Sequence, residues 1–299
     1  MSSSRSGGPG PGGSSSGGSS SGSPDEMGTA GHEEVLQGVR RPLVAGNWKM
    51  NLDHLEAVRV VSEVGLRLHG EDMGSVEASV HPPFTDIRSV QTTLEDRTIP
   101  VALGAQDCHQ EDRGAFTGEV SAPMLARLGV RYVIVGHSER RRYQGETDEL
   151  VGLKLRAVLR HGMMPILCVG ETAAQRDAGA TSEVISSQLK SALDGLSGQH
   201  VARVVIAYEP LWAIGSGTPA GSEDAQAVAR HIRQIACAQV PDGTECAGAL
   251  RVLYGGSVTA DNVGDLLSQP DVDGVLVGGA SLEPASFAEI ILGASRVVG

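Results

Sequence analysis

The sequence predicts a single α/β domain, a (β/α)8 barrel, preceded by a disordered tail rich in glycine and serine. Three observations support this fold class. From residue 41 onward, short runs rich in Val and Ile alternate eight times with longer amphipathic segments. The runs are apolar nearly throughout, as in parallel strands that are covered on both faces. Eight such units in about 260 residues, joined by right-handed crossovers, make a barrel of ordinary size.

The beginning of the chain does not share this pattern. Of residues 1–24, 22 are Gly, Ser or Pro, and a segment of that composition cannot offset the entropy lost on ordering. We therefore expect a disordered low-complexity tail over 1–38 and a catalytic barrel over 39–299. The tail lacks the apolar segment of a secretory signal, and with Arg5 as its single arginine it is unlike a transit peptide. A cytoplasmic location is expected.

The apolar runs predict eight strands in order along the chain. They are 42–47, 76–80, 101–105, 132–136, 165–170, 204–209, 251–255 and 274–278. The clearest helical patterns between them are 55–68, 146–161, 182–193 and 222–239. Helix N-caps are expected at Asp86, Ser121, Ser222 and Asp261. An open doubly wound sheet is the alternative, but no GxGxxG follows the first strand.

Composition and charge narrow the classes of function. Apolar residues make up 40% of the chain and aromatic residues 3%, so aliphatic side chains must fill the core. The formal net charge of -12 argues against a broad surface for nucleic acid or anionic membrane, and no apolar run is long enough to span a bilayer. Four cysteines without a CxxC pair indicate incidental thiols in a reducing compartment. We expect neither nucleic acid nor membrane as a partner, whereas a small anionic substrate is compatible with a locally positive site.

Polar residues stand where the predicted strands end. In a barrel of this class the βα loops at the carboxyl ends of the strands build the active site. Asn47 and Lys49 follow the first strand, His137 follows the fourth, and Glu209 ends the sixth. Glycine turns follow the seventh and eighth strands. This pattern indicates a cation, an imidazole and a carboxylate that face a phosphate cradle of backbone N–H groups. No metal is expected, because the rim has no ligand set with suitable spacing.

Six motifs carry a resemblance to a known family. They are GNWKMN at 46–51, GAFTGEVS at 114–121, GHSERR at 136–141, YEPLWAIGSG at 208–217, YGGSV at 254–258 and VGGASL at 277–282. Over residues 41–296 the sequence resembles the triosephosphate isomerases. That family interconverts dihydroxyacetone phosphate and D-glyceraldehyde 3-phosphate in glycolysis and gluconeogenesis, without a metal or organic cofactor. The resemblance implies the same activity for this chain, and no cofactor.

The resemblance also implies roles for the residues at the strand ends. Glu209 would be the base that moves a proton between neighbouring carbons. His137, kept neutral by the helix N-terminus at Ser138, would donate to the enediolate oxygen, and Lys49 and Asn47 would add positive charge and a further donor. The residues expected to bind substrate are Asn47, Lys49, Gly215, Ser257, Gly278 and Gly279.

Supporting roles follow from the same resemblance. Residues 210–220 resemble a lid that closes over the substrate; in the family Tyr254 and Ser257 hold it closed, and Glu171 meets Trp212 when it is open. Excluding water matters, because an exposed enediol phosphate eliminates phosphate. The residues expected to support the site are Glu139, the partner of Lys49, together with Ser138, Tyr254 and Thr117.

The connection after the third strand predicts a homodimer. Residues 106–120 exceed the usual βα connection of about 2 to 6 residues, and the tip carries the aromatic Phe116. A self-packed Ω-loop is the alternative. The resemblance favours insertion into a second subunit, with Thr117 reaching the partner's Asn47 and the partner's Glu139.

Two other functions compete with the isomerase. Another phosphate-binding barrel, an isomerase or lyase, would share the fold but would not be expected to carry Lys49, His137 and Glu209 in these motifs. A non-catalytic binding or scaffold protein could use the same barrel. Loss of Glu209 or Lys49 would have indicated such a protein, and both residues are present.

Overall fold

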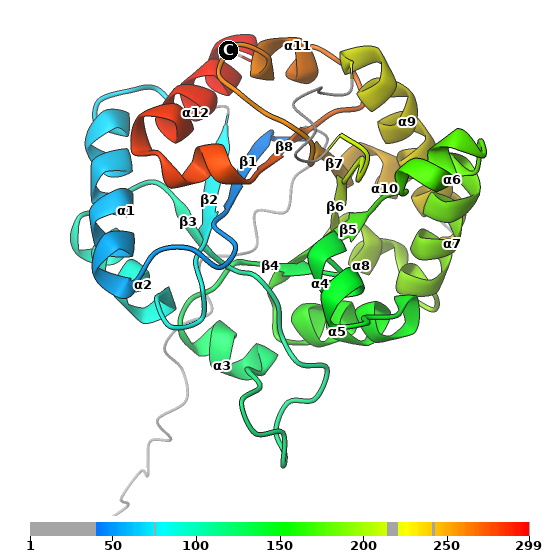
Figure 1. The fold of residues 1–299 in the computed structure, drawn as a ribbon, viewed down its shortest axis with the longest axis horizontal. Coiled ribbons are helices and arrows are strands. Elements are labelled where there is room, and N and C mark those ends of the chain that lie inside the picture. The colour runs from blue at the N-terminus through cyan, green and yellow to red at the C-terminus, as the bar shows by residue number, and fades with distance from the viewer. Residues whose placement is uncertain (1–39, 75, 214–220, 241–242, 299) are drawn as a thin grey trace, which may run out of the picture. The chain divides into compact units, whose positions relative to one another are not determined.

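Eight short strands in the described part of the chain pair in sequence order, all parallel, into a closed barrel (Figure 1). The ring closes where β1 pairs with β8, with Leu43 opposite Gly274. The strands are β1 (Leu43–Asn47), β2 (Glu77–His81), β3 (Ala102–Ala105), β4 (Tyr132–Val135), β5 (Met164–Val169), β6 (Val205–Tyr208), β7 (Arg251–Tyr254) and β8 (Gly274–Val277). The predicted fold class is confirmed, and closure between β1 and β8 excludes the open sheet.

The structure is a computed structural model that describes residues 40–74, 76–213, 221–240 and 243–298. Contacts divide the chain into two units, Met1–Val35 and Leu36–Gly299, and all described residues belong to the second. The tail expected over 1–38 therefore lies outside the described residues. Within the described ranges, every helix is too short or too polar to cross a membrane.

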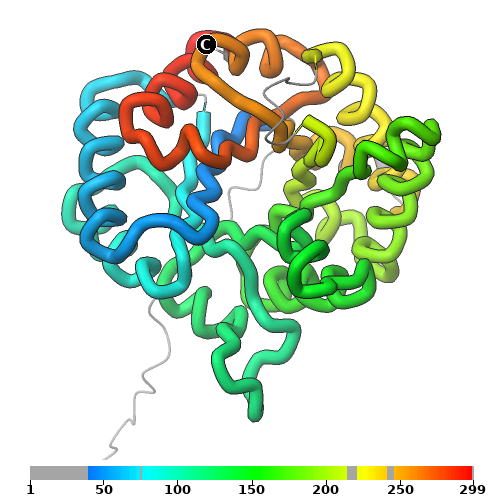
Figure 2. Tube along the Cα trace, in the orientation of Figure 1, coloured from blue at the N-terminus to red at the C-terminus, as the bar shows by residue number. Residues whose placement is uncertain are grey.

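Helices surround the barrel and follow its strands (Figures 1 and 2). They are α1 (His54–Leu68), α2 (Ile87–Asp96), α3 (Ala122–Arg127), α4 (Ser138–Tyr143), α5 (Asp148–Arg160), α6 (Ala173–Asp177), α7 (Thr181–Leu193), α8 (Gly198–Ala202), α9 (Ser222–Ala238), α10 (Gly243–Ala249), α11 (Val263–Leu267) and α12 (Pro284–Val298), with a 3-10 helix η1 (Gly279–Leu282). Local chemistry defines where they start. At α1, Asp53 accepts from the N–H of Leu55 and Glu56, while the Glu56 side chain accepts from Asp53 N–H, and this reciprocal cap starts the helix directly after the first site loop.

Two of the four expected helix caps are wrong by one residue. The caps expected for α2 and α3 are confirmed. At α9 the cap is Gly221, whose extended backbone lets Ser222 enter the first turn. At α11 the cap is Asn262 in place of Asp261.

Apolar side chains fill two separate layers. One cluster lies inside the barrel and includes Leu43 and Ala45 of β1 with Ile134 and Ile166. Val44, between the two inward residues, joins the larger cluster between strands and helices. This alternation follows from the strand period of two. Because both layers are filled mostly by aliphatic side chains, the strands form a packed base that positions the loops at their ends.

The opposite end of the barrel, where the strands begin, is filled by buried polar side chains. Arg251 donates to Glu77 Oε2 and to the Tyr132 hydroxyl, each at 2.9 Å, and Tyr132 donates to Glu77 Oε2 at 2.6 Å. These residues begin β7, β2 and β4. Burial would raise the pKa of Glu77, but the Arg251 charge and the Tyr132 hydrogen bond hold that pKa below its usual value.

Candidate active site

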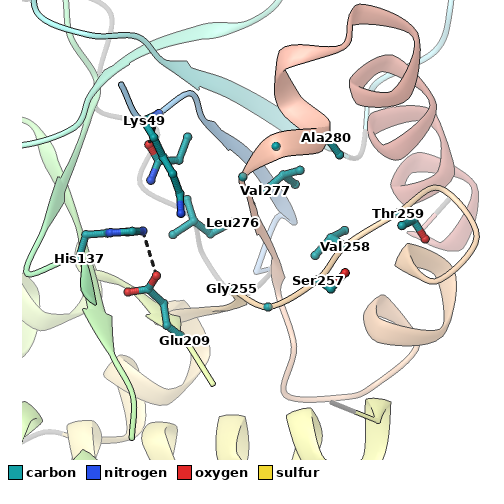
Figure 3. A pocket seen from close by; sticks show the side chains of 14 residues that line it. Lys49, His137, Glu209, Gly255, Ser257, Val258, Thr259, Leu276, Val277 and Ala280 are labelled. Carbon is teal, nitrogen blue, oxygen red and sulfur yellow. Dashed lines mark hydrogen bonds and ion pairs between the residues drawn. The ribbon is translucent and has the colours of Figure 1, made fainter. Parts of the chain in front are cut away.

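A pocket of about 350 Å³ opens at the carboxyl ends of the strands (Figure 3). Its volume lies in the range of small-ligand sites. Lys49 lines it from the end of β1, His137 from the end of β4 and Glu209 from the end of β6. Backbone from two glycine turns, 255–259 after β7 and 277–280 after β8, lines the other side.

Glu209 is the buried carboxylate of this pocket, with 2% of its surface exposed. Its oxygens accept from His137 Nε2 at 2.9 Å, from Ser138 N–H at 3.0 Å and from the Ser138 hydroxyl at 3.3 Å. Burial would raise the pKa of Glu209, but the His137 ring, these hydrogen bonds and the Lys49 charge together hold the pKa below its usual value. The carboxylate is therefore ionised at neutral pH although it is buried.

His137 caps the helix that follows β4, and this position sets its tautomer. Its Nδ1 accepts the backbone N–H of Glu139 at 3.3 Å. A nitrogen that accepts a hydrogen bond carries no proton, so the ring proton lies on Nε2, which faces Glu209. The geometry thus presents a neutral imidazole with an N–H donor directed into the pocket (Figure 3).

Lys49 is held in an unusual backbone conformation. Its φ is +54°, in the left-handed region that non-glycine residues rarely adopt. Asn47 Oδ1 accepts from Lys49 N–H at 3.0 Å, and Gln106 Nε2 donates to the Lys49 carbonyl at 2.8 Å. The ammonium group is paired with Glu139 at 2.6 Å. These contacts fix both ends of the residue, so a strained backbone is maintained beside the pocket.

Sequence reasoning missed Gln106 and Asn262. Gln106 directly follows β3, so the rule that polar residues matter at strand ends could have identified it. Asn262 donates to Ser257 O at 3.1 Å and accepts from Thr259 N–H at 2.9 Å, which holds the turn that lines the pocket. No local pattern distinguishes this residue from an ordinary helix cap.

The turn after β7 requires glycine for a steric reason. A Cβ atom on Gly256 would lie 2.2 Å from the Tyr254 hydroxyl, and one on Gly255 would lie 3.1 Å from Glu209 Cγ. Contacts near 2 Å are forbidden, so a side chain at Gly256 would displace Tyr254 or the turn. The absence of side chains at Gly255 and Gly256 leaves their backbone bare toward the pocket, where it can meet an anion.

Comparison with known proteins decides the family. A family model described as triosephosphate isomerase matches residues 42–294. The chain belongs to the triosephosphate isomerase family. Proteins named triosephosphate isomerase from Saccharopolyspora erythraea and Corynebacterium diphtheriae are 52% and 50% identical to it over 251 and 259 residues. The alignments cover 84% and 87% of this chain and 95% and 99% of those proteins. A third relative, from Cutibacterium acnes, is 50% identical over 84% of this chain and 97% of its own.

The residues that resemble the triosephosphate isomerase lid begin beside a buried acid. Glu171, fully buried, accepts from Trp212 Nε1 at 2.9 Å and from the Tyr208 hydroxyl at 3.0 Å. The expected contact between Glu171 and Trp212 is confirmed. The Arg176 guanidinium lies 4.0 Å above the Trp212 ring. Gly215 and the remainder of the expected lid, 214–220, lie outside the described residues.

The structure brings together most residues that the triosephosphate isomerase resemblance singled out. The predicted residues that line the pocket are Asn47, Lys49, His137, Glu209, Ser257, Gly278 and Gly279. Glu139 and Ser138 contact Lys49 and Glu209 directly, and Tyr254 lies beneath the Gly256 turn. Thr117 is exposed at its loop tip, outside the pocket. No three His, Cys, Asp or Glu side chains gather as metal ligands among the described residues; that no metal or cofactor is needed stays a prediction.

Proposed function

We propose that this pocket interconverts dihydroxyacetone phosphate and D-glyceraldehyde 3-phosphate, the triosephosphate isomerase reaction of glycolysis and gluconeogenesis. One observation carries the assignment: Glu209, His137 and Lys49 line a single pocket together with the two glycine-containing turns after β7 and β8 (Figure 3). Membership of the family supports the same reaction. The reaction is an intramolecular aldose–ketose isomerisation, and the chain's own side chains supply its acid–base chemistry.

Glu209 is the base in this proposal. It takes a proton from the carbon beside the substrate carbonyl and returns it to the neighbouring carbon, with an enediolate between the two steps. Its two contacts with Ser138 occupy oxygens that must reach the substrate. The carboxylate therefore leaves Ser138 when substrate binds. Its lowered pKa means that no proton has to be removed first.

His137, Lys49 and Asn47 stabilise the enediolate. The Nε2–H of neutral His137 donates to the oxygen on which charge develops, and the Glu139 N–H keeps that tautomer. Lys49 supplies a fixed positive charge, held in place by Glu139. Asn47 adds a polar side chain at the end of β1. These groups are ordered before substrate arrives, so little reorganisation accompanies the reaction.

The substrate phosphate binds to the glycine turns. Backbone N–H groups of Ser257, Gly278 and Gly279 are the proposed donors, at the turns after β7 and β8 where barrels of this class bind phosphate. A Cβ atom on Gly278 would lie 3.7 Å from Lys49 Cε, so the lysine stem borders the same space. Gly215 is proposed as a further donor. Tyr254 and Ser257 are proposed to hold the lid closed.

The Glu209→Asp variant tests the role of the base. Shortening the side chain withdraws the carboxylate by about 1 Å, and a misplacement of that size lowers kcat by about 10²-fold. The assay couples glyceraldehyde 3-phosphate turnover to a dehydrogenase that consumes the product. Glu183→Asp, at an exposed position of α7, is the matched control and should keep wild-type kcat. Wild-type kcat in Glu209→Asp would remove Glu209 from the mechanism.

We further propose a homodimer in which the connection after β3 completes the partner's site. The connection projects from the barrel beside α3 (Figure 1), and residues 113–119 are all exposed. Phe116 is 43% exposed, and its ring lies 4.3 Å from that of His109 between centroids. A loop that leaves its own barrel and carries an exposed aromatic residue fits insertion into a second copy better than a self-packed Ω-loop.

Two proposals concern the whole chain. The division into a low-complexity segment over 1–38 and a catalytic domain over 39–299 is supported by composition. The proposed location is the cytoplasm. It is supported by the glycolytic reaction and by the four cysteines, which are all free thiols.

A further inference from the structure

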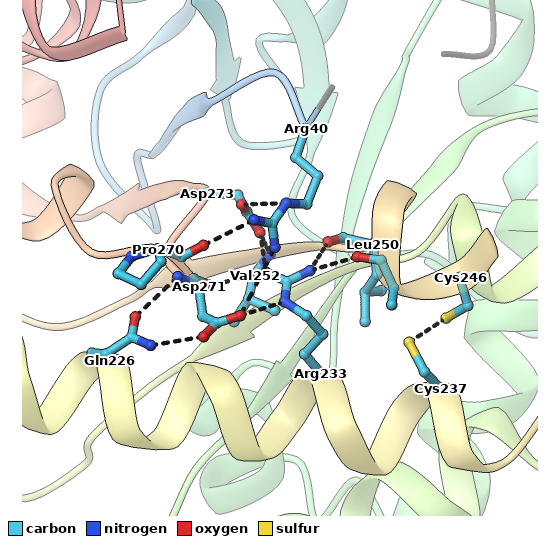
Figure 4. A network of polar contacts seen from close by, with 11 residues as sticks. Arg40, Gln226, Arg233, Cys237, Cys246, Leu250, Val252, Pro270, Asp271 and Asp273 are labelled. Atoms are coloured by element: carbon cyan, nitrogen blue, oxygen red, sulfur yellow. Dashed lines mark hydrogen bonds and ion pairs between the residues drawn. The ribbon is translucent and has the colours of Figure 1, made fainter. Parts of the chain in front are cut away.

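Two cysteines outside the active-site pocket lie in contact (Figure 4). Cys237 is near the end of α9, Cys246 is on α10, and their Sγ atoms are 2.8 Å apart. Both are free thiols. A disulfide bond is about 2.05 Å long, so the sulfurs need to approach by less than about 1 Å to form one. The packing of α9 against α10 has therefore placed two thiols within reach of a bond.

We propose that Cys237 and Cys246 form a reactive dithiol that low-molecular-weight disulfides oxidise to an intramolecular disulfide. The Cys237 thiolate attacks one sulfur of the oxidant RSSR, which breaks its S–S bond and releases one RSH after protonation. Cys246 loses its proton and attacks the Cys237 sulfur, which releases the second RSH. The chain loses two hydrogens and two electrons, and the oxidant gains them as two thiols.

The two thiols differ in exposure and in pKa, the two properties that distinguish an attacking thiol from a resolving one. Cys237 is partly exposed, whereas Cys246 is fully buried. The hydrogen bond between Cys237 and Cys246 and the charge of Arg233, one turn earlier on α9, lower the pKa of the Cys237 thiol. The same contact, together with burial, raises the pKa of Cys246. Cys237 is thus the thiol that an oxidant can reach and that ionises first.

The other two cysteines lack these features. Cys108 and Cys168 are each 1% exposed. Burial raises the pKa of Cys108 to about 12 and raises that of Cys168 well above its usual value. A reagent that reaches only exposed thiolates therefore distinguishes the proposed pair from the rest of the protein.

The surrounding network indicates what the disulfide would do. Arg233 donates to the carbonyl oxygen of Leu250, the residue between α10 and β7, and pairs with Asp273 at 2.6 Å. Asp273 in turn accepts from Val252 N–H at 2.8 Å (Figure 4). These groups lie where β7 and β8 begin, at the end of the strands opposite Glu209. Oxidation would join α9 to α10 covalently at a place that Arg233 already holds. We expect a higher Tm in the oxidised protein and a kcat/KM within twofold of the reduced value.

The test titrates the folded, reduced full-length protein with 5,5′-dithiobis(2-nitrobenzoate). The expected result is release of two thionitrobenzoates per chain with no adduct retained. Both cysteines lie in one tryptic peptide, 234–251, and that peptide should become lighter by two hydrogens. No release, or one release with a retained adduct, would overturn the proposal. This measurement needs no variant, so it does not depend on a variant's folding.

Three variants assign the order of attack. Cys246→Ser should release one thionitrobenzoate and keep the adduct on Cys237, whereas Cys237→Ser should release none. Cys108→Ser is the matched control and should behave as wild type. Release that persists in Cys237→Ser would refute the assignment of the attacking thiol. A Tm that does not rise on oxidation, or a kcat/KM that changes more than twofold, would refute the stabilising role.

Discussion

Gln106 holds the backbone of Lys49 but does not line the pocket. Replacing its side chain therefore measures how much catalysis depends on the backbone position of Lys49. Lys49 has a φ of +54°, and a left-handed conformation costs a non-glycine residue about 1–2 kcal/mol. Gln106 Nε2 donates at 2.8 Å to the carbonyls of Lys49 and His81, and each bond contributes about 1 kcal/mol. Gln106→Met keeps the volume but removes both donors. Because the bond to Lys49 no longer offsets the strain, we expect kcat/KM to fall about 5- to 10-fold.

The coupled isomerase assay should resolve kcat and KM, with circular dichroism and Tm to verify folding. Gln106→Glu should lose more than Gln106→Met, because its carboxylate can only accept and would face two carbonyl oxygens. Gln234→Met, at an exposed position of α9, is the matched control and should match wild type. A folded Gln106→Met with kcat/KM within twofold of wild type would show that Lys49 keeps its position without this contact.

Further predictions concern pH-dependent stability, the oligomeric state, the N-terminal tail and metal dependence. Desolvation lowers the pKa of the fully buried His81 to about 4. As pH falls from about 6.5 toward 4, this histidine binds a proton in the unfolded chain but stays neutral in the folded protein. The free energy of unfolding should therefore drop by about 3 kcal/mol over that range. Urea titrations should show this pH dependence reduced in His81→Gln and unchanged in the exposed control His54→Gln. Replacing Phe116 and Thr117 with charged residues should give a monomer with much lower turnover, and a fully active monomer in sedimentation would contradict the dimer proposal. Deleting residues 1–36 should leave kcat/KM and Tm nearly unchanged, since Gly, Ser and Pro bury little apolar surface, and a loss of several degrees would contradict this. EDTA should not lower activity. A loss of activity in EDTA that a divalent ion reverses would instead show a metal requirement.

Most of the barrel and most of its rim could be predicted from sequence, because both depend on local pattern. The eight short apolar runs singled out in the sequence are strands in the structure, and each predicted strand end lies within one residue of the observed end. The ends of the strands share one rim, so Lys49, His137 and Glu209 could be assigned to one pocket before the structure was known. The roles expected for these three residues came from the resemblance of the motifs to the family.

Other features depend on which side chains meet after packing. The hydrogen bond from Gln106 to Lys49 joins residues 57 positions apart, and the buried pair of Arg251 and Glu77 joins residues 174 apart. All four cysteines, Cys237 and Cys246 among them, were interpreted from sequence as incidental thiols because they include no CxxC pair, and the contact between these two depends on how α9 and α10 pack. The periodicity of a sequence predicts which face of a helix is buried. It does not predict which element that face packs against, or the position of the helix along that element. Such contacts are decided only when helices dock on the closed barrel, since close packing then selects one arrangement of side chains.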